Sequence, residues 1–401
     1  MSASRDQRSG SKRKILGAIR SAGRIARIDL AKKTGISQAT VTTITAEMLL
    51  AGLIHEVPSD DEDRNARRGR PRVGLALRGE AHTVVGVKIS HQSLSIVLLD
   101  FSGDVIGEHS APLAAAVQPA VDVAEQLRNQ IAIAAEKAGI SMKQVSAVGV
   151  GMPGIVDATR GFVHWSPSLT ERNQPFQDIA QDVIGCPVFV DNDANLVAMA
   201  ELMFGHGKNV QDFIVVTVES GVGMGIVLGG ELYRGTRGCG AEFGHTKVQL
   251  DGALCRCGQR GCLEAYVADY ALLREADVGQ NNKQSSARQI AVLLKSARDG
   301  DATAQSIVNR AGRMFAMGLA NLVNVFDPQL IILAGERVQF NHLYADEVMD
   351  SIRQQIVQID LPPPDIVIHK WGDLMWARGA GAFAIHGVSD MALKDLGEHA
   401  S

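Results

Sequence analysis

The sequence predicts a multidomain protein with an N-terminal winged helix-turn-helix and, after it, an α/β domain made of two lobes. The chain has 401 residues, too many for one core of ordinary size. Residues 12–57 show the apolar spacing of short helices followed by a strand. From Thr83 onward, strand-like and helix-like patterns alternate, which indicates an α/β domain.

These patterns also suggest where the domains begin and end. We expect residues 1–80 to form a DNA-binding domain with a basic wing or linker, and residues 81–401 to form the α/β domain. Within the second domain, we expect one lobe at about 81–195 plus a C-terminal segment, and the other at about 196–380.

The net charge of −4 hides an asymmetry along the chain. Residues 1–80 hold 16 Lys and Arg against 9 Asp and Glu, whereas the rest of the chain holds 24 against 35. This favours nucleic acid as a partner of the N-terminal part alone, although a solvated basic segment explains the charge equally well. The sequence has no run of 18 apolar residues and no secretory signal, so we expect a cytoplasmic protein with no membrane partner.

Three helices are expected in the N-terminal domain, at Lys12–Ser21, at Arg27–Thr34 and from an N-cap at Ser37 to Leu50. Ala31 is small enough for the last two helices to approach, and Gly35 can adopt the positive φ of the turn between them. Val41 and Ile44 would hold the third helix to the core, which leaves a polar N-terminal end suited to a major groove. The alternative is an ordinary three-helix packing unit. The predicted DNA-contacting residues of this helix are Ser37, Gln38, Thr40, Thr42 and Thr43, with Ala39 on the same outward face.

A wing is expected between two strands, Leu53–Val57 and Val73–Leu77. Residues 58–72 between them are charged or turn-forming, and they contain the run Arg67-Arg-Gly-Arg-Pro71. This run resembles an AT-hook, which inserts arginines into an A·T-rich minor groove, and it nominates Arg68 and Arg70 as DNA contacts. The alternative is a loop that touches only phosphates.

A weak internal repeat divides the α/β domain. Strand, turn, strand, tight turn and third strand are expected at 84–106 and again at 213–233. Two such β-meanders predict two similar lobes, although apolar strands can also resemble one another by chance.

Several motifs in this domain resemble those of the ROK family of repressors, open reading frames and kinases, in particular its repressor branch. The strongest stretches are residues 219–235, Ala241-Glu-Phe-Gly-His245 and residues 255–264, with support from residues 150–157 and 191–195. The resemblance spans about residues 12–390. It implies an actin/hexokinase-like (ribonuclease H-like) fold with a sugar in the cleft.

The resemblance also implies the sugar contacts and the chemistry of the site. The residue that matches Asp193 is the general base in kinases of the family. Carboxylates suit a hexose because each accepts two hydrogen bonds from neighbouring hydroxyls. The implied sugar-binding residues are Asn192, Asp193, Glu242, His245 and Glu264.

The phosphate-binding half departs from the family pattern. The Asp-x-Gly-Gly-Thr loop of the kinases is replaced by Lys88-Ile-Ser-His-Gln92, and a Gly-Thr-Gly loop is replaced by Glu219-Ser-Gly221. A carboxylate beside a triphosphate is repulsive, and loss of transition-state charge stabilisation costs orders of magnitude in rate. We therefore expect no catalytic residue and no enzymatic activity, with Asp193 a vestigial base.

Four residues within one loop have the spacing of metal ligands, His245-x9-Cys255-x-Cys257-x4-Cys262. Three thiolates and an imidazole fill a tetrahedral Zn²⁺ site, so we expect one structural zinc ion per chain. Gly258 and Gly261 would let the loop fold back, and His245 would offer its second nitrogen to the sugar. Cys186 and Cys239 are expected to be ordinary thiols.

Together these features predict a transcriptional repressor that binds a double-stranded operator and responds to a sugar or sugar phosphate. We expect a homodimer or a dimer of dimers, because paired recognition helices fit a palindromic site. The first alternative is an active sugar kinase with an appended DNA-binding domain, and a second is a DNA-tethered sensor of a protein partner.

Overall fold

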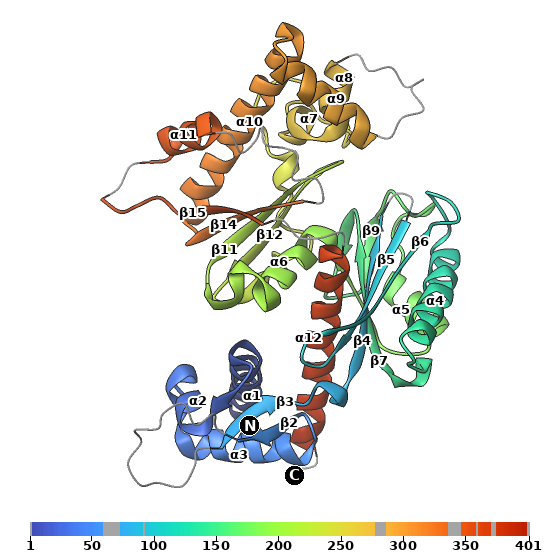
Figure 1. The fold of residues 1–401 in the computed structure, drawn as a ribbon, viewed down its shortest axis with the longest axis vertical. Coiled ribbons are helices and arrows are strands. Elements are labelled where there is room, and N and C mark those ends of the chain that lie inside the picture. Colours follow the sequence, from blue (N-terminus) through green and yellow to red (C-terminus); the bar gives the residue numbers. More distant parts are fainter. Residues whose placement is uncertain are drawn as a thin grey trace. The chain divides into compact units, whose positions relative to one another are not determined.

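The computed structural model describes residues 2–58, 73–90, 93–276, 286–335, 346–357, 360–369 and 374–398. The chain forms two compact units, the first made of Met1–Asn192 with Trp376–Ser401 and the second of Asp193–Met375 (Figure 1). The first unit therefore contains both ends of the chain. Among the described residues, no helix combines the length and the apolar character that crossing a bilayer requires.

The N-terminal part of the first unit is a winged helix-turn-helix. Helices α1 (Ser2–Ala22), α2 (Arg27–Thr34) and α3 (Gln38–Leu50) bury Ile15, Ile19, Leu30, Ile44 and Met48 between them. Strands β2 (Ile54–Val57) and β3 (Gly74–Leu77) confirm the two predicted wing strands. The prediction was incomplete in two respects: α1 begins at Ser2 rather than Lys12, and a short strand, β1 (Ile25–Ala26), pairs with β3.

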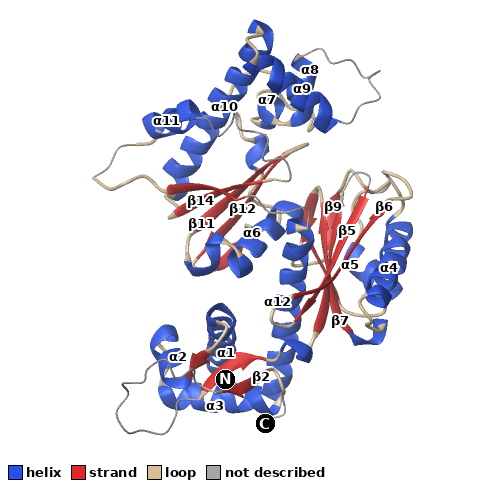
Figure 2. Ribbon diagram, in the orientation of Figure 1, coloured by secondary structure: helices blue, strands red, loops and turns tan. Residues whose placement is uncertain are grey.

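A five-stranded sheet forms the centre of the first unit, with strand order β10-β7-β4-β5-β6. An antiparallel meander is extended by two parallel strands, and a separate hairpin pairs β8 with β9. One face of the sheet packs on two helices through a core that includes Val85, Val87, Leu127 and Phe176 (Figure 2). The elements are β4 (Thr83–Ile89), β5 (Ser93–Asp100), β6 (Val105–Pro112), β7 (Val145–Met152), β8 (Ile155–Asp157), β9 (Phe162–Trp165), β10 (Val188–Asn192), α4 (Ala120–Lys137) and α5 (Phe176–Ile184).

The C-terminal helix α12 (Met375–Glu398) packs on the opposite face of this sheet. Contact is close because glycines line the interface. A Cβ atom at Gly86 would lie 2.0 Å from the Ala377 carbonyl oxygen, and one at Gly149 would lie 1.9 Å from that of Ala380. Since side chains alternate between the two faces of a strand, Gly86 points toward α12 while Val85 and Val87 point into the core on the other face.

The second unit repeats this plan. Its sheet has strand order β13-β12-β11-β14-β15, again an antiparallel meander extended by two parallel strands, which confirms the predicted repeat. Helix α6 packs so closely on β12 that a Cβ at Gly225 would lie 2.6 Å from the Ala198 Cβ. The elements are α6 (Asp193–Phe204), β11 (Phe213–Val218), β12 (Val222–Leu228), β13 (Glu231–Tyr233), α7 (Glu264–Val267), α8 (Asp269–Glu275), α9 (Ser286–Arg298), α10 (Ala302–Phe326), β14 (Leu330–Ala334), α11 (Asp346–Gln355) and β15 (Asp365–His369).

Two arginines of α1 join the helix-turn-helix to the rest of the first unit. Arg13 donates from Nε and Nη2 to the two carboxylate oxygens of Asp390 in α12, at 2.7 and 3.0 Å. Arg20 donates to the Phe101 carbonyl oxygen and lies over the Phe101 ring, 4.9 Å from its centroid. Burial lowers the pKa of Arg20 to about 10, against the opposing effect of the Asp100 charge. Both arginines therefore link the helix-turn-helix to this unit through polar contacts.

Candidate DNA interface and ligand site

The turn between α2 and α3 has the geometry that the sequence predicts. Gly35 has φ 69° and its backbone N–H donates to the Ala31 carbonyl, which closes α2. Ser37 is the N-cap of α3, because its Oγ accepts from the Thr40 backbone N–H at 3.2 Å. Each of these interactions is local in sequence, so the residue types alone fix the turn.

The buried and exposed residues of helix α3 are those that the sequence predicts. Val41 and Ile44 are buried, whereas Gln38, Ala39, Thr40, Thr42 and Thr43 are exposed. The exposed residues occupy the N-terminal part of the helix, where a recognition helix contacts base edges. Their identity as DNA contacts is a prediction that the geometry permits.

Helix α1 fixes α3 through a buried ion pair. Lys12 is 3% exposed, and its Nζ lies 2.9 Å from Glu47 Oε2, while Arg8 contacts the other carboxylate oxygen. Burial alone would raise the pKa of Glu47, but the hydrogen bonds and charges of Lys12 and Arg8 outweigh it and hold that pKa below its usual value. The ionised form of Glu47 is therefore the one that links α3 to α1.

The wing strands β2 and β3 pair in antiparallel register from Ile54 opposite Leu77 to Val57 opposite Gly74. Residues 59–72, which contain the predicted contacts Arg68 and Arg70, lie outside the described residues. The AT-hook hypothesis therefore stays a prediction.

The implied sugar contact of the first unit is Asn192, the last residue of β10. Its side-chain Nδ2 donates to the Gly154 carbonyl oxygen at 2.8 Å, and its backbone N–H donates to Asp191 Oδ1 at 2.7 Å. The amide is thus held at the carboxyl end of the parallel strand pair β7–β10, the edge where ligands bind in open α/β sheets.

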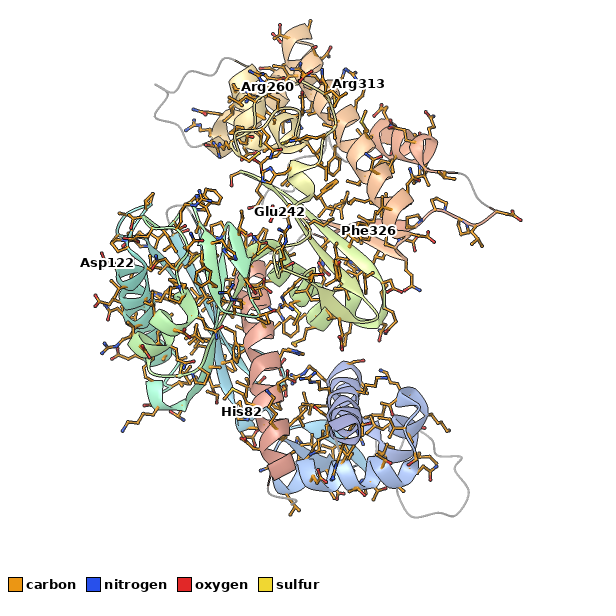
Figure 3. The ribbon with its side chains drawn as sticks, turned by 180° about the vertical axis from the view of Figure 1, so that it is seen from behind. His82, Asp122, Glu242, Arg260, Arg313 and Phe326 are labelled. Carbon is orange, nitrogen blue, oxygen red and sulfur yellow. The ribbon has the colours of Figure 1, made fainter. Side chains whose placement is uncertain are left out.

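The second unit brings the other four implied contacts together. His245 Nε2 lies 3.9 Å from Glu242 Oε2, and Glu264 Oε2 accepts from the Val222 backbone N–H at 3.3 Å. Partial burial raises the pKa of Glu242; the charges of Glu264 and Asp193 add to this and that of His245 opposes it. Glu242, labelled in Figure 3, is therefore close enough to Glu264 and Asp193 for their charges to affect its pKa. A cluster of carboxylates of this kind suits neighbouring hydroxyl donors.

The four predicted metal ligands also converge. The ligand atoms of His245, Cys255, Cys257 and Cys262 all lie within 4.8 Å of one another. Cys257 Sγ and Cys262 Sγ are 3.8 Å apart, and Cys255 Sγ is 3.7 Å from His245 Nδ1. A tetrahedron with Zn–S bonds of about 2.3 Å has S···S edges of about 3.8 Å, so these two separations fit a metal ion of this kind.

Two glycines allow the metal loop to turn, as predicted. Gly258 has φ 86° and Gly261 has φ 75°, and a Cβ at Gly261 would lie 1.7 Å from the Gln249 carbonyl oxygen. Because His245 turns Nδ1 toward Cys255, its Nε2 remains on the side of Glu242. One imidazole thus belongs to both clusters.

Sequence reasoning missed two residues beside the metal ligands. Lys247 Nζ lies 3.0 Å from Cys262 Sγ, and the Tyr270 hydroxyl lies 3.3 Å from Glu264 Oε1 and 3.6 Å from Cys255 Sγ. Lys247 lies two positions after the predicted ligand His245, and this spacing could have indicated that it lies near the metal cluster. Tyr270, eight residues beyond Cys262, gives none.

In the phosphate-binding half, Lys88 is 5% exposed at the end of β4, with its Nζ 3.8 Å from the centroid of the Trp376 ring. His91 and Gln92 lie outside the described residues. Glu219 occupies the turn between β11 and β12, where its backbone N–H donates to the Gly221 carbonyl oxygen. Cys186 and Cys239 are half-buried outside the metal cluster, and burial raises the pKa of the Cys186 thiol to about 11.

Comparison with known sequences identifies two regions. The profile of the ROK family matches residues 84–386, and that of a winged helix-turn-helix DNA-binding domain matches residues 8–55. The DNA-binding transcriptional repressor Mlc of Escherichia coli is 30% identical over 83% of this chain and 82% of its own length. The xylose repressor of Caldicellulosiruptor bescii is 28% identical over 82% of this chain and 84% of its own length. The glucokinase of Streptomyces coelicolor is 31% identical over 75% of this chain and 96% of its own length.

Among solved structures, this chain is similar both to a transcriptional regulator and to a sugar kinase. A ROK family transcriptional regulator described as a homologue of E. coli Mlc superposes with a TM-score of 0.78 and 26% identity, over 97% of this chain and 98% of its own. A ROK hexokinase from Thermus thermophilus superposes with a TM-score of 0.65 and 30% identity, over 77% of this chain and 99% of its own. The predicted fold class, a winged helix-turn-helix with an actin/hexokinase-like domain, is confirmed.

Proposed function

This chain belongs to the ROK family, and we propose that it is a sugar-responsive DNA-binding repressor of genes for carbohydrate uptake or catabolism. The observation that carries the proposal is the presence, in one chain, of an exposed recognition helix and a cluster of carboxylates suited to sugar hydroxyls. Residues 1–80 bind a double-stranded operator, and residues 81–401 bind the effector. The repressors that the chain resembles along more than four-fifths of its length support this division.

The effector is a sugar or sugar phosphate bound through Asn192, Asp193, Glu242, His245 and Glu264. Glu242 and Glu264 each accept from a pair of neighbouring hydroxyls, and a sugar that lacks one of them leaves a carboxylate oxygen unpaired. Partial burial raises the pKa of Glu242, with a further contribution from the charges of Glu264 and Asp193, and hydrogen bonds from sugar hydroxyls would stabilise its ionised form. Specificity and affinity thus come from the same contacts.

The metal cluster holds one structural Zn²⁺ ion per chain through His245, Cys255, Cys257 and Cys262. The distances of 3.7 and 3.8 Å between donor atoms support this assignment. Bound zinc fixes the tautomer and the orientation of the His245 ring, so that Nε2 can meet a sugar hydroxyl.

Phosphoryl transfer has been lost. The buried Lys88 side chain stacked on Trp376 and the carboxylate of Glu219 replace residues that would face a nucleotide. The second candidate is an active sugar kinase with a DNA-binding domain, which the intact Asp193 and the glucokinase relative favour. A coupled assay with ATP across common sugars separates the two. We expect no turnover above background, and turnover that Asp193→Asn abolishes would establish the kinase.

The repressor acts as a homodimer or a dimer of dimers, because a palindromic operator requires paired recognition helices. Sugar binding changes operator affinity by about 5–150-fold, the usual range of coupling between two sites.

The test begins with a thermal-shift screen of hexoses, pentoses, amino sugars and their phosphates, in which a ligand raises the unfolding midpoint by mass action. Fluorescence anisotropy then measures operator affinity with and without the hit. Glu242→Ala should bind the operator as wild type does and fail to respond to the sugar. Arg70→Ala should weaken DNA binding and leave sugar binding intact.

Glu231→Ala is the matched control, because Glu231 is an exposed glutamate of the same unit on β13, outside the carboxylate cluster. It should respond to the sugar as wild type does. If Glu242→Ala also responds, Glu242 does not contact the effector and the sugar-site assignment is wrong.

A further inference from the structure

The exposed threonines of α3 use their hydroxyl groups within the helix itself. Thr42 Oγ1 donates to the Gln38 carbonyl oxygen at 2.8 Å, and Thr43 Oγ1 donates to that of Ala39 at 3.1 Å. Thr40 Oγ1 shares a 2.8 Å hydrogen bond with the Ser37 hydroxyl, which also caps the helix. The hydroxyl hydrogens of Thr42 and Thr43 are therefore committed to the backbone.

This arrangement changes what the helix presents to a partner. When Oγ1 turns back to the carbonyl four residues earlier, the Cγ2 methyl is the other heavy atom on Cβ and stays free for contact. Ala39, Thr42 and Thr43 are spaced i, i+3 and i+4, so their methyl groups share one face of the helix. All three residues are exposed. The recognition face thus includes a patch of methyl groups, two of them from threonines.

Two further features narrow the base pairs that such a face can recognise. Helix α3 contains no lysine or arginine, the residues that most often contact guanine O6 and N7 in the major groove. The Gln38 side-chain amide at its first position has no hydrogen-bond partner within the described part of the chain. Glutamine donates to N7 and accepts from N6 of adenine, and apolar groups contact the C5 methyl of thymine.

We propose that α3 recognises A·T base pairs in the major groove by packing the methyl groups of Ala39, Thr42 and Thr43 against thymine methyls, with Gln38 hydrogen-bonded to an adenine. The inference rests on the proposed function, because it requires sequence-specific DNA binding. It assigns to Thr42 and Thr43 a role in base specificity that depends on their methyl groups rather than on their hydroxyl groups.

The probe is a duplex selected by the full-length chain from a random-sequence pool. Deoxyuridine then replaces each thymine of the enriched site in turn, which removes one C5 methyl and leaves base pairing unchanged. At the thymines that α3 contacts, we expect each replacement to weaken binding by about fourfold, the effect of losing one buried methyl group.

Substitutions at the same positions separate methyl from hydroxyl contacts. Thr42→Val keeps the methyl and should bind within about twofold of wild type, whereas Thr42→Ser keeps the hydroxyl and should bind about fourfold more weakly. On the duplex with deoxyuridine at the contacted position, Thr42→Ser should lose no further affinity. The same pair at Thr43 repeats the test, and circular dichroism of each variant checks that α3 is intact.

The outcomes distinguish this inference from the proposed function. If the pool yields no enriched sequence, sequence-specific binding fails and both are wrong. If a sequence is enriched but Thr→Val weakens binding while Thr→Ser does not, the hydroxyls carry recognition and only the methyl inference is overturned. Enrichment of G·C pairs at the bases protected by α3 would overturn it in the same way.

Discussion

Replacing Cys257 by serine tests the metal site most directly. The four donor atoms lie within 4.8 Å of one another, so each ligand would supply about a quarter of the coordination of a bound ion. Structural zinc binds with an apparent free energy of about 10–16 kcal/mol, and loss of one ligand therefore removes about 3 kcal/mol from the folded second unit. For a unit of about 180 residues this lowers the unfolding midpoint by about 6–12 °C.

The assay combines metal analysis of dialysed protein with thermal unfolding in the presence and absence of a chelator. Wild type should carry about one zinc per chain and lose stability when the chelator is added. Cys257→Ser should carry much less metal and be insensitive to the chelator. Cys239→Ser is the control, because Cys239 is half-buried outside the cluster.

Two results would refute the reasoning. One is wild-type protein that is folded, contains less than about a tenth of an equivalent of metal and is unaffected by the chelator. The other is a Cys239→Ser variant that loses as much metal as Cys257→Ser does, since this would show that any thiol change disturbs the unit.

Two further predictions concern stability. Gly86→Ala should lower the unfolding free energy by about 3 kcal/mol, because the added Cβ would lie 2.0 Å from the Ala377 carbonyl oxygen. Gly17→Ala should raise it by about 0.5–1 kcal/mol, because Gly17 lies in a helix and a Cβ there meets nothing within 4 Å. Denaturant titration of both variants checks the pair, and an unchanged unfolding free energy for Gly86→Ala would contradict the close packing of α12. The ionised Glu47 has a pKa below its unfolded value of 4.5, so its contribution to stability is complete above about pH 4.5 and is lost as the pH falls through the folded pKa. Lys12→Met should flatten this acid dependence, and denaturation midpoints that shift with pH in the same way for variant and wild type would show that the ion pair contributes nothing.

The sequence was most informative where the determining interactions are local. Gly35, Ser37 and the buried Val41 and Ile44 were predicted because capping, turn geometry and helical periodicity act within a few residues. The convergence of the four candidate metal ligands was predicted for the same reason, since three of the four fall within one short loop.

Interactions between distant residues could not be predicted from one sequence. Strand β1 has two residues, and it exists because it pairs with β3, almost fifty positions away. The contact of Arg13 with Asp390 joins the two ends of the chain, and nothing near either residue marks it. The start of α1 was missed because residues 2–11 have no apolar periodicity.

The discontinuity of the first unit has a consequence for how the protein is made. Its sheet is complete once Asn192 has been synthesised, but α12, which covers the Gly86 and Gly149 face and holds Arg13 through Asp390, is made only after the whole second unit. At about 5–20 residues per second, roughly 10–40 s separate these events. During this interval the Arg13 side chain has no Asp390 to bind, whereas the Phe101 carbonyl oxygen that accepts from Arg20 has already been made. A product cut short before Trp376 therefore keeps the Arg20–Phe101 contact but lacks the Arg13–Asp390 ion pair, and synthesis of α12 is the step that adds it.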